Sequence, residues 1–559
     1  MQNVLRVCAF GFAGLFLTTC GSSTQCGTIT GTAWTPAVPA ASASHHNSGI
    51  TVTKTTQTGS GTVVGLGQAA PASVEISFPI DMTADLGALG SITLVASVTS
   101  FPSALQGGAY PMLVSLSDGT NEYINLARAG SGGDCAQSGY YTCASGYCSA
   151  NSACTISQPS AYKNRTLWEQ HQAPNTSGEN SPSTNTFPTC NWSGGSAGSA
   201  TDPRCEFNST FFPGANNPPR LRYGVTYTAK YVLVADSYSS VSPRTGTMEL
   251  AVYKKSTPAT TGASAGAIDF NVILVGDTTV QASRTTKGQQ NLNTLMESVA
   301  GYFSQTASNV TLGTVNAVEW ACSAGGESYS TLNIDDLGTM LQDGSALADS
   351  STQGKAMNLF LVSSITDDGT LGSSGFTILG FDGAIGGPPV HGTATSGLTV
   401  ATFDQLDTFN ADCSEAAATC PLSAQDADFE ELGAVLAHEI GHYFGLNHLS
   451  ESAGDEHDSI RDTPFCTSTI TSGGQQYITL SACLNTDTSA YPPSGSRCNQ
   501  VCTSYNSSTG TFCPTVAECS FNYLMWWTTK NFNVTTDTGD GNLLSTGSGV
   551  VINYSPLVQ

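Results

Sequence analysis

Apolar and polar residues alternate with a period of two over much of the first half of the chain. In "GVTYTAKYVLVAD", Val225, Tyr227, Ala229, Tyr231 and Leu233 would share one face of a strand. The stretches "GTMELAVYKK", "SITLVASVTSF" and "PMLVSLSDGTNEYINLA" repeat this alternation, with Gly and Pro at the breaks. Short alternating strands separated by turn residues predict an all-β, antiparallel sandwich over residues 49–255, with a Cys-rich insertion at about 130–220.

The pattern changes after "KKSTPATTGASAGA" (254–267), which has the composition of an interdomain connector. "AIDFNVILVG" (267–276) reads as a buried strand, and apolar residues then recur at helical spacing at Leu292, Leu295, Met296, Val299 and Phe303. "VTLGTVNAVEW" and "AMNLFLVSSI" are further strand candidates, and "DADFEELGAVLAHEIGHYFGLNH" is a long helix candidate. This alternation predicts an α/β (α+β) domain over residues 267–535. The chain is therefore expected to be multidomain, as its 559 residues also suggest.

The two ends of the chain are expected to lie outside both domains. Residues 1–20 contain one Arg and an apolar run, which is typical of an export signal. "LTTCG" also resembles a bacterial lipoprotein processing box, which would make Cys20 the lipidated first residue; a plain secretory signal cut nearby is the alternative. Residues 21–48 are rich in Ser, Thr, Ala, Gly and Pro and predict a flexible linker, and residues 536–559 form a C-terminal tail.

Charge and cysteine usage narrow the function. The formal net charge of -24, with only 11% charged residues, argues against a nucleic-acid partner. Setting aside Cys8 and Cys20 leaves an even number of cysteines out of 18, which in an exported chain predicts disulfide bonds. The disulfide prediction agrees with two local clusters of cysteines: Cys135, Cys143, Cys148 and Cys154, and Cys483, Cys498, Cys502, Cys513 and Cys519. The alternative for Cys143 to Cys154 is a zinc knuckle.

The strongest chemical signal is "HEIGHYFGLNH" at residues 438–448. On a helix, His438 and His442 project from one face and can bind one ion. Gly445 can take a positive φ and end the helix, so that His448 can swing back as a third ligand. Three imidazoles leave one tetrahedral position open, which is the geometry of a catalytic zinc. By chance the full pattern would arise with a probability on the order of 10⁻⁵.

Glu439 lies beside these ligands, where it can act as a general base. A zinc-activated water would attack a carbonyl, and Glu439 would take its proton and pass it to the leaving amine. The expected cofactor is Zn²⁺, because three imidazoles suit it, although copper, nickel or cobalt could occupy the same site in vitro. The alternative is that His-Glu-x-x-His occurs here by coincidence, in a helix that binds no metal.

At this motif the sequence resembles the metzincin zinc metallopeptidases, whose H-E-x-x-H-x-x-G-x-x-H pattern it matches at every defined position. "FNYLMWW" (521–527) is similar to the methionine turn of that family, with Met525 as its methionine. "GDEHDSIRDTPFC" (454–466) and the Asn-Tyr before Met525 are most similar to the pappalysin branch, from which the sequence departs at Leu524 and at Trp527. The resemblance covers about residues 267–535.

This resemblance implies a five-stranded sheet over two helices, with an open cleft suited to internal bonds of a peptide. An edge strand within residues 376–403 would pair with an extended substrate, and its glycines, among them Gly380 and Gly383, would let the peptide approach. The branch often binds Ca²⁺ near the site, and Asp455, Asp458 and Asp462 could supply oxygens, with plain solvated acidic residues as the alternative.

The sequence therefore predicts an exported zinc metalloendopeptidase that acts on a protein or peptide substrate. It would be secreted or located at the cell surface, where it could be an outer-membrane lipoprotein anchored through an N-terminal lipid. The β-rich half could dock substrate, hold the enzyme latent or recognise a surface, and Cys26 could cap the zinc as a fourth ligand. The alternatives are a cell-surface binding protein or adhesin that uses a metalloprotease-like scaffold, and hydrolysis of a non-peptide bond.

Overall fold

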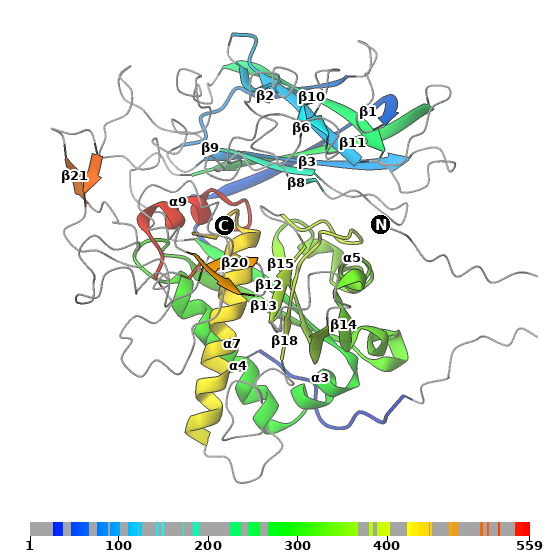
Figure 1. Ribbon diagram of the computed structural model, residues 1–559, viewed down its shortest axis with the longest axis vertical. Helices are drawn as coiled ribbons and strands as arrows, with labels where there is room; N and C mark the ends of the chain where they lie inside the picture. Colours follow the sequence, from blue (N-terminus) through cyan, green and yellow to red (C-terminus); the bar gives the residue numbers. More distant parts are fainter. Residues whose placement is uncertain are drawn as a thin grey trace, which may run out of the picture.

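The computed structural model gives the protein a mixed α/β structure with several sheets (Figure 1). It describes residues 26–36, 46–65, 75–87, 90–100, 110–120, 122–125, 141–142, 148–149, 171–172, 183–188, 224–235, 244–257, 266–366, 379–383, 388–402, 422–446, 448–449, 469–472, 475–478, 504–506, 511–513, 524–525 and 543–559. Of the helices in these ranges, none is both long and apolar enough to cross a bilayer.

Within the described residues, nine strands of the N-terminal half form one sheet. Its order is β5-β4-β10-β1-β11-β3-β9-β8, with β2 paired to β10. The strands are β1 (Thr51–Gly65), β2 (Ile76–Met82), β3 (Ser91–Ser100), β4 (Tyr110–Ser117), β5 (Glu122–Asn125), β8 (His171–Gln172), β9 (Ser183–Pro188), β10 (Val225–Ala235) and β11 (Arg244–Ser256). A separate short pair is formed by β6 (Tyr141–Thr142) and β7 (Cys148–Ser149).

The predicted period-two strands are present, but their sheet differs from a sandwich of two separate sheets. β1 and β11 are 15 and 13 residues long and pair along most of their length. β3 contacts β4, although three strands separate them in the sheet order, so the sheet curls back on itself. Leu94, Tyr231 and Leu250 are fully buried in the space that it encloses. One continuous sheet takes the place of two separate sheets because β1 and β11 pair with each other and join β10 on one side to β3 on the other.

The part of the C-terminal half that the structure describes is built on a five-stranded sheet of order β13-β12-β15-β18-β17. Its strands are β12 (Ala267–Val275), β13 (Thr311–Trp320), β15 (Ala356–Val362), β17 (Gly380–Asp382) and β18 (Leu398–Ala401). β12, β13, β15 and β18 run parallel, and β17 is the antiparallel edge strand beside β18. Short pairs accompany the sheet: β14 (Thr331–Asn333) with β16 (Ser364–Thr366), β19 (Thr469–Ser472) with β20 (Gln475–Ile478), and β21 (Ser504–Asn506) with β22 (Thr511–Cys513).

The helices of this half are α3 (Gly276–Ser283), α4 (Thr286–Phe303), α5 (Leu337–Ser345), α7 (Leu422–Tyr443) and α9 (Thr546–Tyr554). The five residues that predicted a helix after the first strand are all buried on α4. β12 is buried on both faces: Phe270 and Val272 belong to the core beneath α4 and α7, and Ile273 and Val275 to the core beside α5. That is why its sequence is continuously apolar.

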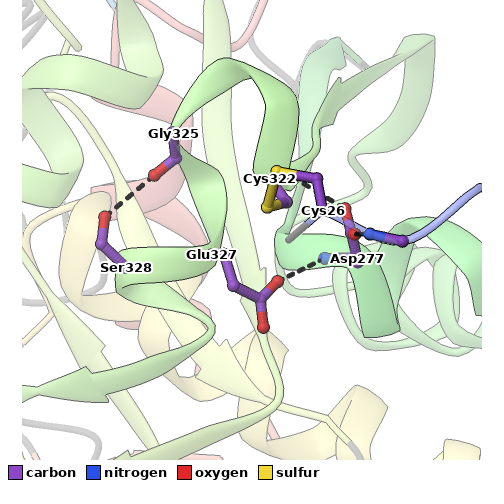
Figure 2. The surroundings of a disulfide bond; sticks show 7 residues. Cys26, Asp277, Cys322, Gly325, Glu327 and Ser328 are labelled. Atoms are coloured by element: carbon purple, nitrogen blue, oxygen red, sulfur yellow. Dashed lines mark hydrogen bonds between the residues drawn. A yellow bond between two sulfur atoms is a disulfide. The ribbon is translucent and has the colours of Figure 1, made fainter. Parts of the chain in front are cut away.

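A flexible linker was expected over residues 21–48, and the described part of that range at residues 26–36 corrects this expectation. Cys26 forms a disulfide bond with Cys322, 296 residues further along the chain (Figure 2). Asp277 accepts hydrogen bonds from the backbone N–H of Gly27 and of Cys322, at 3.0 and 2.8 Å, and so braces both sides of this bond. The sequence predicted disulfides for this chain, and this pair is the one that the described residues contain.

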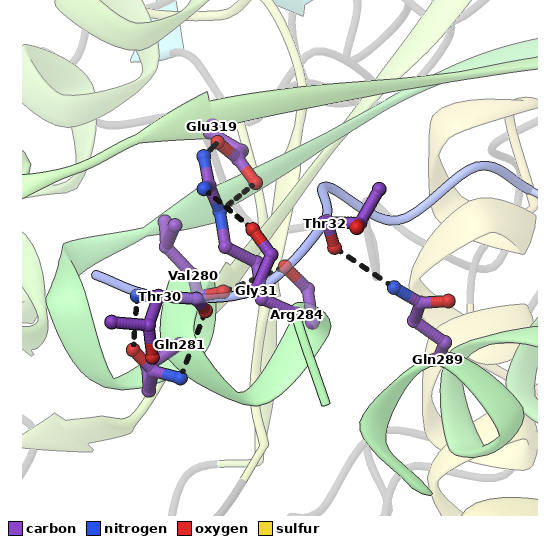
Figure 3. Close-up of polar contacts among 9 residues, drawn as sticks. Thr30, Gly31, Thr32, Val280, Gln281, Arg284, Gln289 and Glu319 are labelled. Atoms are coloured by element: carbon purple, nitrogen blue, oxygen red, sulfur yellow. Dashed lines mark hydrogen bonds and ion pairs between the residues drawn. The ribbon is translucent and has the colours of Figure 1, made fainter. Parts of the chain in front are cut away.

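Residues 26–36, which we call the strap, then run along α3 and α4 (Figure 3). Side chains of Gln281, Arg284 and Gln289 bond the strap backbone, the last two by donating to the carbonyls of Gly31 and Thr32 at 3.1 and 3.0 Å. Trp34 is 4% exposed, and its indole N–H donates to Asn293 Oδ1. A segment poor in apolar residues is thus ordered by polar contacts to its backbone and by one buried tryptophan.

The C-terminal residues correct the expectation of a tail over residues 536–559. In residues 543–559, α9 is followed by Leu557 and Val558, both fully buried, and Gln559 exchanges backbone hydrogen bonds with Ala267 at the start of β12. The Lys255 ammonium of β11 donates to carbonyls at the end of α9. The segment therefore packs between the two halves of the molecule (Figure 1).

Candidate metal centre

Three histidines come together at the carboxyl end of α7. The Nε2 atoms of His438 and His448 are 3.2 Å apart, and those of His442 and His448 are 3.0 Å apart. The three side chains form a group that could hold a metal ion. The convergence predicted from their spacing is confirmed.

The chain reaches this arrangement through an abrupt end to α7 at Gly445. Gly445 has a φ of +103°, a conformation that residues with a Cβ rarely adopt. The N–H of Gly445 donates to the carbonyl of His442, and the N–H of Leu446 donates to the carbonyl of Gly441. This pair of hydrogen bonds is the Schellman motif, which ends a helix and redirects the chain. His448 can then face the two helical histidines, as the sequence predicted.

Backbone carbonyls fix the protonation of two of the rings. His438 Nδ1 lies 2.7 Å from the carbonyl oxygen of Leu524, and His442 Nδ1 lies 2.8 Å from that of Leu446. A carbonyl oxygen only accepts hydrogen bonds, so each Nδ1 carries the proton and each Nε2 presents its lone pair. Both lone pairs face His448 Nε2, and the three Nε2 atoms together surround one place where a cation could bind. Neutral imidazoles oriented by backbone carbonyls are the donor set and surroundings that zinc takes in proteins.

Met525 lies against the helix that carries the histidines. A Cβ on Gly441 would be 2.4 Å from the Met525 sulfur, so the thioether packs directly on α7 next to His442. Met525 is 2% exposed, and its carbonyl accepts a hydrogen bond from the N–H of Leu449 at 3.1 Å. Leu524 and Met525 form a turn that touches the chain on both sides of the three histidines.

Glu439 lies beside the histidines and beneath the edge strand. A Cβ on Gly380 of β17 would be 2.7 Å from Glu439 Cγ, so the carboxyl side chain fits only because this strand position is glycine. Burial raises the pKa of the Glu439 carboxyl well above its usual value, and the negative charge of Asp382 acts in the same direction. A divalent cation on the neighbouring rings would oppose both effects.

Protonation and exposure also suit a reactive centre. Burial, followed by the proximity of His448 and His438, lowers the pKa of His442 well below its usual range, so the ring is neutral at pH 7. His442 is 7% exposed, and His438, His448 and Glu439 are half-buried. The most buried of the three rings is therefore His442, which a backbone carbonyl also orients.

The remaining sequence candidates have different outcomes. Asp455, Asp458 and Asp462, the candidate calcium ligands, lie outside the described residues, as do Cys20 and Trp527. The hypothesis that Cys26 caps the zinc is wrong, because its sulfur is bonded to Cys322.

Comparisons with known proteins leave the chain without an assigned family. No family model matches the sequence, and no curated protein matches it. A chain from a solved structure described as "Structure of a chaperone-substrate complex" is similar at 11% identity, over 53% of this chain, with a TM-score of 0.24. This chain spans about a third of that protein's length, since 36% of it is covered.

Sequence reasoning missed the groups that surround the ligands. Leu446 and Leu524 act through their carbonyl oxygens, which no side-chain pattern reveals. The Tyr443 hydroxyl donates to the carbonyl of Thr395, 2.9 Å away, and ties α7 to the segment before β18. The only signal for Gly380 is its place in a glycine-rich edge strand, which suggested access for a peptide but not its contact with Glu439.

Proposed function

We propose that this chain is a zinc-dependent endopeptidase in which Glu439 is the general base. The observation that carries the proposal is the convergence of the Nε2 atoms of His438, His442 and His448 on one place, with the Glu439 carboxyl group on the same helix beside them. Met525 against α7 and an antiparallel edge strand on a five-stranded sheet also agree with the resemblance to the metzincins and their pappalysin branch.

Each residue has a defined part in the proposed reaction. The three histidines would hold the zinc, which when bound lowers the pKa of a coordinated water to about 7 and polarises a carbonyl. Glu439 accepts a proton as the water oxygen bonds to the peptide carbonyl carbon. The C–N bond then breaks, and Glu439 returns the proton to the leaving amine. A peptide extended along β17 would pass over Gly380 and so lie next to Glu439.

We also propose export from the cytoplasm. The Cys26–Cys322 bond supports this, because disulfides that join distant parts of a chain form and persist in oxidising compartments. The Ca²⁺ site and the lipid anchor at Cys20 remain predictions from the sequence.

The proposal is tested by metal analysis and proteolysis of the purified full chain. We expect one zinc per chain and cleavage of denatured casein that stops when a chelator is added. Glu439→Gln should keep the zinc and lose about 10²–10⁴-fold in kcat, which is the typical contribution of a general base. Glu297→Gln, on the exposed face of neighbouring α4, is the matched control and should cleave as the unaltered protein does.

Two results would count against this function. Undiminished cleavage by Glu439→Gln would show that Glu439 is not the general base. Zinc bound without cleavage of casein, gelatin or a peptide library would favour the alternative of a cell-surface binding protein built on the same scaffold.

A further inference from the structure

The two halves of the molecule meet next to the candidate site. Residues 388–397, which we call the bridging loop, connect the edge strand region to β18. On one side this loop touches the β-rich sheet, and on the other it touches α7 and β17.

The contact with the β-rich half uses the outer face of its sheet. Val95, Ala251 and Tyr253 form a buried cluster there, and Val390 of the bridging loop packs against it. Val95 lies on the opposite face of β3 from Leu94 and Val98, which fill the interior of the curled sheet. An apolar outer face in a sheet is therefore covered by the other half of the same chain.

The contact with the site runs through backbone groups. Gly383 donates to the carbonyl of Gly397 at 2.9 Å, and a Cβ on Gly383 would be 3.2 Å from the Thr395 Cα. Thr395 is held from the other side by the Tyr443 hydroxyl of α7. The end of the edge strand at Gly383 thus rests on the bridging loop, three residues beyond Gly380, which lies against Glu439.

We infer that the outer face of the β-rich sheet is a positioning surface for the peptidase site: through Val390 it holds the bridging loop, which fixes β17 over Glu439. The inference rests on the proposed endopeptidase function. It makes the β-rich half part of the device that presents an extended peptide to the general base. Val95 and Val390 are accordingly positioning residues, which act through β17 and touch neither substrate nor metal.

The test compares two valine truncations on one strand. Val95→Ala reduces the cluster that supports the bridging loop, whereas Val98→Ala truncates a similarly buried side chain that faces the interior of the curled sheet. Both variants are made in the full chain loaded with zinc. Cleavage is measured with a long peptide, which can pair along β17, and with a short peptide that reaches only the bond to be cut.

We expect Val95→Ala to lower kcat/KM for the long peptide by about tenfold, since displacing the reacting geometry by about 1 Å costs up to about 100-fold. The short peptide should lose less, zinc content should stay the same, and Val98→Ala should leave the ratio of the two substrates unchanged. Val390→Ala should repeat the Val95→Ala result. Equal losses in Val95→Ala and Val98→Ala, in step with their melting temperatures, would overturn the inference.

Hydrogen exchange separates this inference from the proposed function. The N–H groups of Gly383 and Ala401 bond Gly397 and Leu379 across the edge strand region. Their exchange should speed up by about tenfold or more in Val95→Ala and stay unchanged in Val98→Ala, whether or not the protein cleaves any peptide. Unchanged exchange in Val95→Ala would refute the positioning role even in an active peptidase.

Discussion

Lys255 provides a quantitative test of the contact between the β-rich sheet and the C-terminal segment. The side chain is 1% exposed, and its ammonium donates to the carbonyls of Asn553 and Ser555 at 2.6 and 2.9 Å. Burial alone lowers the pKa of Lys255 to about 7, from 10.5 in an exposed lysine. The two carbonyls solvate the ammonium only in part, so the folded chain favours the neutral amine.

This pKa difference makes stability depend on pH in a defined direction. Between about pH 7 and 10.5 the unfolded chain binds a proton at Lys255 that the folded chain has released, so the free energy of unfolding rises with pH across that window. Below about pH 7 both states are protonated and this contribution is constant. With these two pKa values, the gain from pH 7 to pH 9 is about 2 kcal/mol.

The assay is urea unfolding of the full chain at pH 7, 8 and 9. Lys255→Met keeps the length of the side chain and removes its titration. The free energy of unfolding of the unaltered protein, minus that of the variant, should therefore increase by about 2 kcal/mol from pH 7 to pH 9. Lys254→Met, at the preceding and partly exposed position of β11, is the control, and its free energy of unfolding should change with pH as that of the unaltered protein does. Parallel stability curves for Lys255→Met and the unaltered protein would refute the reasoning.

Three further outcomes follow from the site and the strap. Gly445→Ala should destabilise the protein by about 1–2 kcal/mol, because alanine strains at positive φ, and should weaken zinc binding about tenfold in a competition assay by misplacing His448. Removing zinc with a chelator should lower the melting temperature, and zinc at about 100 times its Kd should restore about 3 kcal/mol; an unchanged melting temperature would argue against the metal site. Replacing Cys26 and Cys322 together by serine should cost up to about 5 kcal/mol of unfolding free energy, because the bond closes a loop of nearly 300 residues.

The features that the sequence predicted well are those encoded by local spacing. The apolar residues of α4, the continuous run of β12 and the three histidines each lie within about 20 positions of one another, and helix or strand geometry alone decides where they point. The end of α7 could be predicted for the same reason, since the positive φ of Gly445 changes the direction of only the next few residues.

What the sequence did not predict depends on partners far away in the chain. The partner of Cys26 is 296 residues distant, and no spacing rule selects Cys322 from the other cysteines. The strap resembles a linker in composition, yet Gln281, Arg284 and Gln289 form hydrogen bonds with its backbone, and composition carries no information about such distant partners. The outward-facing Val95 likewise looks like any other strand residue until the bridging loop is seen to cover it.

The turn of Leu524 and Met525 shows that the candidate site also depends on backbone groups. The atom of Leu524 that faces the site is its carbonyl oxygen, which accepts from His438 Nδ1. Any residue supplies that oxygen, provided that the turn keeps its backbone path. The path is set by Leu449, which donates to the carbonyl of Met525, and by Leu543, whose carbonyl accepts from Leu524. Under the proposed function, side-chain identity should therefore be strict at the three histidines and Glu439, which would supply the chemistry, and permissive around them, where the backbone supplies the orientation.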